Sequence, residues 1–203
     1  MKSREMDKLT KHFDTFFHQK NEYVLHPVVM TDPHIDTLIY EPNEAYPYWK
    51  LVTMGASDYR MPAPKKALGD RNEYIMFIDP KEDLKDKAVL DRYMRYLMEV
   101  AMYPANNHCF VSYGHSMEWA IESGEEMTGA YLEMPQLISD PAVMRCKLGL
   151  FKTAICLQVI LLTRKEIDRL LEIGSERFSY WLYPEDPTAP RHFLCELSRS
   201  DIF

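Results

Sequence analysis

The stretch Trp49-Lys-Leu-Val-Thr-Met-Gly-Ala-Ser-Asp-Tyr-Arg-Met-Pro-Ala-Pro64 passes from an apolar run into a turn. Its Gly55-x-Ser57 spacing is also how α/β-hydrolases present a nucleophilic serine. That motif requires a second small residue two positions after the serine, and this chain has Tyr59 there. Two prolines soon afterwards oppose the helix that the motif needs next. The stretch therefore predicts a strand followed by a turn, and we expect no catalytic role for Ser57.

The turn itself needs two kinds of residue. A chain that leaves a strand and reverses requires a position tolerant of positive φ, and Gly55 supplies it without steric cost. Backbone N–H groups that the sheet no longer pairs need an acceptor, and the short carboxylate of Asp58 is well placed in sequence to provide one. We therefore interpret Gly55, Ser57 and Asp58 as a structural motif.

Patterns on both sides of this stretch predict an α+β fold. β-Branched and aromatic runs indicate strands over 34–41, 48–54, 72–78, 109–113, 130–133, 146–151 and 153–162. Apolar residues at helical spacing indicate helices over 3–20 and over 84–102, the second ending before Pro104. A capping box at Thr163-Arg-Lys-Glu166 opens another helix through 173, which resumes toward 182. We expect one domain over 1–203, with a mainly antiparallel or mixed sheet flanked by helices and a surface tail over 184–203.

Composition narrows the classes of function. The chain has 203 residues and a net charge of −7, which argues against nucleic-acid binding and favours a basic protein partner. The most apolar run, 153–162, is about half the length of a membrane span, so no membrane segment is expected. Four cysteines without a C-x-x-C pair, and an N-terminus without a signal-peptide pattern, predict a reducing cytoplasm.

One cluster of polar residues resembles a metal site. Asp32, His34 and Asp36 alternate along a predicted strand, with His26 nearby in sequence. Such alternation is more typical of the solvent-exposed face of a strand, so we expect no metal and no cofactor. A hydrolytic or metal-dependent enzyme that uses Ser57 or the Asp32, His34 and Asp36 group stays an alternative. A self-associating structural protein is a second one.

The opening stretch resembles the suppressor of fused family. The matching residues are His34-Ile-Asp-x-x-x-Tyr40 and Tyr48-x-x-Leu-Val-Thr-x-Gly-x-Ser-Asp-x-x-Met-x-x-Pro64, and the likeness extends over residues 30–183. In this family the Gly-x-Ser-Asp segment is structural. The resemblance implies a protein-binding module, and relatives of the single-domain bacterial type found beside polymorphic toxins are thought to be immunity proteins. It also implies partner contacts near Tyr96, Asn107 and His108.

Overall fold

Two strands that are buried on both faces form the centre of the sheet, β4 (Asn72–Ile78) and β8 (Thr153–Thr163). The computed structural model describes residues 1–27, 31–119, 127–183 and 192–202. β4 and β8 run parallel to each other, and every other pairing of named strands is antiparallel. The predicted α+β fold with a mixed sheet is confirmed.

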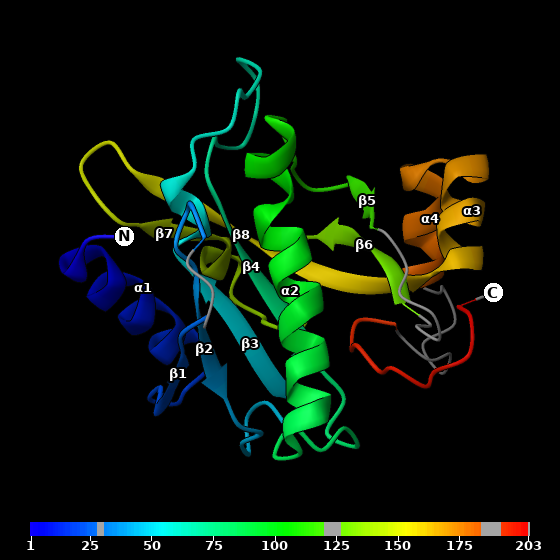
Figure 1. The fold of residues 1–203 in the computed structure, drawn as a ribbon, viewed down its shortest axis with the longest axis horizontal. Coiled ribbons are helices and arrows are strands. Elements are labelled where there is room, and N and C mark those ends of the chain that lie inside the picture. The colour runs from blue at the N-terminus through cyan, green and yellow to red at the C-terminus, as the bar shows by residue number, and fades with distance from the viewer. Residues whose placement is uncertain (28–30, 120–126, 184–191, 203) are drawn as a thin grey trace.

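The strand order across the sheet is β1-β2-β3-β4-β8-β6-β5, and β7 pairs with the first part of β8 (Figure 1). The remaining strands are β1 (Tyr23–Leu25), β2 (Asp36–Tyr40), β3 (Trp49–Met54), β5 (Ser116–Glu118), β6 (Met127–Glu133) and β7 (Arg145–Lys147). A short 3₁₀ turn, η1 (Ala56–Asp58), follows β3, and a second one, η2 (Pro141–Met144), precedes β7.

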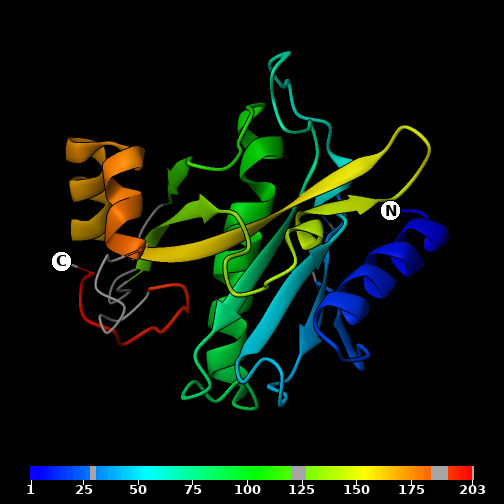
Figure 2. The ribbon, with the colours of Figure 1, turned by 180° about the vertical axis from the view of Figure 1, so that it is seen from behind.

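Two helices cover opposite faces of this sheet (Figures 1 and 2). Because successive side chains of a strand point to opposite faces, Met76 packs in one core with α2 (Lys87–Asn107). Its neighbour Phe77 packs in a second core with α1 (Ser3–Phe16). Strand β4 is therefore held from both sides.

A third core lies at the far end of the sheet, where α3 (Arg164–Ile173) and α4 (Ser175–Leu182) pack on β6 and β8. The predicted capping box starts α3: Glu166 N donates to Thr163 Oγ1, and Thr163 N donates to Glu166 Oε2. No helix in the described ranges is long and apolar enough to cross a membrane.

Helix α2 does not end before Pro104, as predicted, but continues to Asn107. A proline in the last turn removes one N–H donor, while its carbonyl still accepts from Cys109 N at 3.1 Å. The left-handed His108, with φ +48°, then ends the helix. The next segment, 109–113, was predicted as a strand but forms none. A single side-chain bond, from Asn72 Nδ2 to Val111 O at 3.0 Å, ties it to β4.

The C-terminal segment also differs from the prediction of a surface tail. Phe193, Cys195 and Leu197 are buried, and Cys195 forms a parallel bridge with Ile78 at the end of β4. Phe193 packs in the core beneath α3 and α4, whereas Cys195 and Leu197 pack in the core beneath α2. The expected surface position is therefore wrong at these three residues, and residues 184–191 lie outside the described part.

Candidate functional site

The turn after β3 requires a glycine. Gly55 has φ +130°, and a Cβ atom added there would lie 2.2 Å from the backbone oxygen of His34. No L-residue with a side chain fits this approach without displacing backbone. This is the role that the sequence predicted for Gly55.

The acceptor for the turn is Glu73, a residue that the sequence interpretation did not single out. Its carboxylate accepts from Thr53 Oγ1 at 2.6 Å, from Gly55 N at 3.0 Å and from Ser57 N at 3.1 Å. Glu73 is fully buried, and burial raises the pKa of its carboxyl above the ordinary value. A glutamate inside the apolar strand Asn72–Ile78 was the signal available in the sequence.

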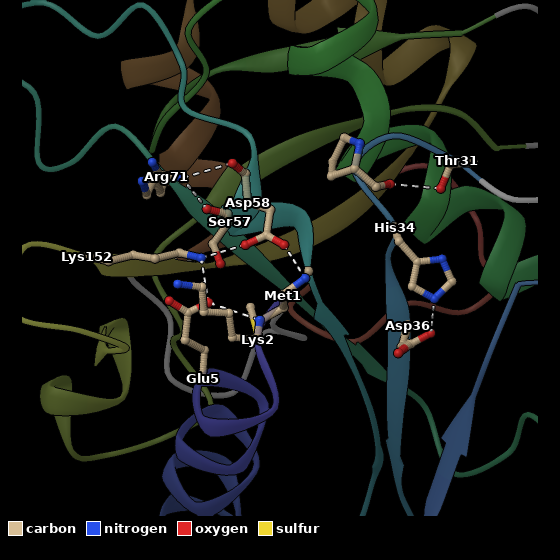
Figure 3. A network of polar contacts seen from close by, with 12 residues as sticks. Met1, Lys2, Glu5, Thr31, His34, Asp36, Ser57, Asp58, Arg71 and Lys152 are labelled. Atoms are coloured by element: carbon tan, nitrogen blue, oxygen red, sulfur yellow. Dashed lines mark hydrogen bonds and ion pairs between the residues drawn. The ribbon is translucent and has the colours of Figure 1, made fainter.

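Asp58, which we predicted to accept these N–H groups, points instead toward Lys152 and the Met1 amino group (Figure 3). Lys152 Nζ lies 2.5 Å from its Oδ1, and the Met1 amino group pairs with its Oδ2. Lys152 also binds Glu5 Oε2 at 3.0 Å, so the network joins the turn to α1 and to the β7–β8 hairpin. Burial alone would raise the pKa of Asp58, but the Lys152 and Met1 cations hold it below its ordinary value.

Ser57 is fully buried under this network. Its backbone N binds Glu73, and its carbonyl accepts from Arg71 Nη1 at 2.7 Å. Within the described residues, no hydrogen bond joins its hydroxyl to a histidine. A buried serine hydroxyl that no histidine contacts in the described part of the chain does not have the arrangement of an activated nucleophile, so the geometry does not support the hydrolase alternative.

A groove lies between the segment after η1 and the C-terminal end of α2. Its larger part has a volume of about 540 Å³ and is lined by Tyr59, Arg60, Met61, Pro62, Ala63, Asp70 and His108. Its smaller part, about 360 Å³, is lined by Asp32, Pro33, Asp58, Tyr59, Arg60, Ala105 and His108. The opening stretch of the sequence and one predicted contact residue, His108, thus share one surface. We call it the His108 groove.

The other two predicted contact residues lie differently. Asn107 is exposed beside the groove, and its side chain caps the helix by donating to Tyr103 O at 2.9 Å. Tyr96 is only 1% exposed and stacks on Trp119, with ring centroids 5.7 Å apart. The Tyr96 side chain therefore belongs to the core beneath α2.

Sequence reasoning missed a second exposed feature, the tip of the β7–β8 hairpin. Residues 148–151 were predicted to continue a strand, yet Leu148 N and Gly149 N both donate to Lys152 O and close a turn. As a result Leu150 is 81% exposed and Phe151 is 97% exposed. Lys152, the residue after this tip, binds Asp58 and so joins the hairpin to the turn that lines the His108 groove.

The candidate metal ligands are partly brought together. His26 Nδ1 lies 2.8 Å and His34 Nε2 lies 3.0 Å from Asp36 Oδ1. Asp32 is exposed and is not part of this cluster. The expected solvent-exposed face is wrong for Asp36, which is only 3% exposed and has the imidazoles of His26 and His34 against its carboxylate.

Comparisons with known proteins agree with this fold. The family model described as suppressor of fused protein (SUFU) matches residues 31–188. A SUFU homologue from Neisseria gonorrhoeae superposes with a TM-score of 0.67 at 10% identity, covering 98% of this chain and 97% of that chain. The structure of a Sufu–Fu complex gives 0.67 at 11% identity, with 98% and 92% covered. Drosophila Suppressor of Fused gives 0.64 at 11% identity, with 98% of this chain but 50% of that chain covered. No curated protein matches the chain in sequence. The chain belongs to the suppressor of fused family.

Proposed function

We propose that this protein is a non-enzymatic binding module for another protein. The observation that carries the proposal is the exposure of Leu150 and Phe151 at the hairpin tip. Large apolar side chains are exposed to solvent at this projecting turn, and their burial by a partner would stabilise a complex. Aromatic anchors of this kind commonly contribute much of the affinity of a protein interface.

The His108 groove extends the proposed surface. The turn at Asp58 connects it to the hairpin tip through Lys152. Arg60, with a side chain 73% exposed, and His108 offer donors for a partner segment in the groove. The tip therefore offers apolar anchors and the groove offers polar groups, two kinds of contact that protein interfaces combine.

The specific version of this proposal is an immunity protein that neutralises a toxin domain in the cytoplasm. Support comes from the resemblance to single-domain relatives found beside toxins, and from the net charge of −7, which favours rapid capture of a basic partner. Four free cysteines are compatible with a reducing compartment. Recovery of a toxin-like protein by co-purification from the native host tests this version, and its absence would remove the immunity role alone.

The binding surface is tested with matched variants in the same co-purification. Leu150→Ser with Phe151→Ser removes two exposed anchors without disturbing the core, and we expect partner recovery to fall at least about tenfold. Leu171→Ser on α3, where the leucine is 68% exposed, is the control and should keep the partner. His108→Asn tests the groove, because asparagine tolerates the left-handed backbone there. Equal recovery by all variants would place the interface elsewhere.

A further inference from the structure

We propose that His26, His34 and Asp36 form a binding site for a divalent transition-metal ion, with Zn²⁺ as the best-matched ion. The three residues each offer one ligand atom, and these atoms all lie within 4.8 Å of one another. Two imidazoles and one carboxylate are ligands that Zn²⁺ accepts readily. The proposal is independent of partner binding at the hairpin tip.

Sheet register positions the three ligands. Strands β1 and β2 pair antiparallel with Leu25 opposite Thr37, so the next residues along, His26 and Asp36, come opposite each other. His34 precedes Asp36 by two positions and therefore points to the same side of the extended chain. The Gly55 turn packs on the backbone oxygen of His34 and fixes its position. The pairing of β1 with β2 and the contact between Gly55 and His34 therefore hold the three ligands in place.

The two distances from the imidazoles to Asp36 are close to the ligand separations of a tetrahedral site. Zn²⁺ bound at about 2.0 Å by nitrogen and oxygen separates neighbouring ligand atoms by about 3.3 Å. The two N···O distances to Asp36 Oδ1, 2.8 and 3.0 Å, need only small side-chain rotations to reach this value. A cation would also supply positive charge to Asp36, a carboxylate whose side chain is 4% exposed.

The open side of the site faces solvent. The His26 side chain is 67% exposed and the His34 side chain is 42% exposed. Three protein ligands with one accessible position leave room for a water molecule as the fourth ligand. The ion would also fasten β1, a strand of three residues at the edge of the sheet, to β2.

Isothermal titration of chelator-treated protein with ZnCl₂ tests the site directly. We expect one Zn²⁺ per chain, and a rise in the midpoint of thermal unfolding that excess EDTA reverses. His26→Gln, His34→Gln and Asp36→Asn should each weaken Zn²⁺ binding by at least about tenfold. His115→Gln, which removes an exposed histidine outside the cluster, should bind as the wild type does.

Circular dichroism of each variant separates loss of the site from loss of the fold. Because Asp36 is buried, the exposed His26 variant decides the outcome alone if Asp36→Asn unfolds. Absence of saturable Zn²⁺ binding overturns the proposal, as does wild-type affinity in the His26 variant. Either result would mean that the two imidazoles only donate hydrogen bonds to Asp36.

Discussion

Two fully buried ionisable side chains, Glu73 and Lys50, lie at opposite ends of the β3–β4 pair. Both point to the face that α1 covers, since they share the strand alternation of Phe77 and Val52. Glu73 accepts three hydrogen bonds of 2.6–3.1 Å from the turn after β3. Lys50 Nζ makes one bond of 2.8 Å, to Glu41 O, and two of 3.4 Å.

The comparison shows that two buried ionisable groups in one strand pair can differ in how fully their hydrogen bonds are satisfied. Each group binds backbone atoms where the chain leaves the sheet, so each organises a connection. The Glu73 end has a full set of donors, while Lys50 has carbonyl and amide acceptors and no ion-paired carboxylate among the described residues. Burial consequently lowers the pKa of Lys50 to about 8. We expect perturbations at the Glu73 end to cost more free energy of unfolding.

The largest effect is expected for Gly55→Ala. The new Cβ would meet the backbone oxygen of His34 and would also require a strained φ. We expect the free energy of unfolding to fall by about 4 kcal/mol, measured by denaturant unfolding. Gly114→Ala is the control: its φ is +79°, but nothing lies within 4 Å, so about 1 kcal/mol is expected. Equal losses in the two variants would show that the contact with His34 has no energetic role.

The second largest effect is expected for Glu73→Ala, which should lower the free energy of unfolding by about 3 kcal/mol in the same measurement. It leaves the Thr53 hydroxyl and the N–H groups of Gly55 and Ser57 without their buried acceptor. Release of a buried carboxyl offsets part of this cost. Glu73→Gln keeps one acceptor oxygen, so its free energy of unfolding should fall by less than that of Glu73→Ala. A Glu73→Ala protein as stable as the wild type would contradict the assignment of Glu73 as the organiser of the turn.

The buried Lys50 should make the free energy of unfolding depend on pH. Its pKa falls from 10.5 to about 8 on folding, so between these values the unfolded chain binds more protons. The Lys50 contribution to the free energy of unfolding therefore rises as pH increases through 8. Relative to Lys50→Met, the wild type should gain about 2 kcal/mol between about pH 7.5 and about pH 9.5. A difference between the two proteins that does not change with pH would show that Lys50 is not desolvated.

A smaller effect is expected at the outward side of the turn, for Asp58→Ala. Its pairs with Lys152 and the Met1 amino group are partly exposed, so the expected loss is about 1 kcal/mol at low salt. The loss should shrink in high salt because counterions screen the pairs. Asp91→Ala, which breaks a far more exposed pair with Lys87, should cost under about 0.5 kcal/mol. A larger loss at high salt would mean that Asp58 acts through something other than charge.

The sequence predicted the regions where one local pattern decides the structure. Strand β4 carries a continuous apolar run, and its predicted bounds, 72–78, match the structure. The start of α3 follows from a capping box whose two hydrogen bonds are both local. Gly55 could be assigned because positive φ is a property of a single residue.

The remaining features depend on contacts between segments that are distant in sequence. Glu73 binds turn residues that lie 16 and 18 positions earlier, and the antiparallel pairing of β3 and β4 brings them together. Burial of Cys195 requires its bridge with Ile78, which no local pattern encodes. His26 reaches Asp36 through the register of β1, whereas alternation along one strand also indicated Asp32, which lies outside the cluster. The sequence therefore indicated the regions of the candidate sites, whereas strand pairing determines which residues form them.

The smallest effect should come from Ser57→Ala, although Ser57 is as buried as Glu73. The turn uses the Ser57 backbone: its N–H donates to Glu73 and its carbonyl accepts from Arg71, and alanine keeps both bonds. We expect a change below about 1 kcal/mol in denaturant unfolding and unchanged partner recovery in co-purification. If the variant were stable yet lost its partner, the serine hydroxyl would have a functional role. Because that hydroxyl is buried, such a role would require the turn to open, and the Glu73 end would then be less rigid than its hydrogen bonds indicate.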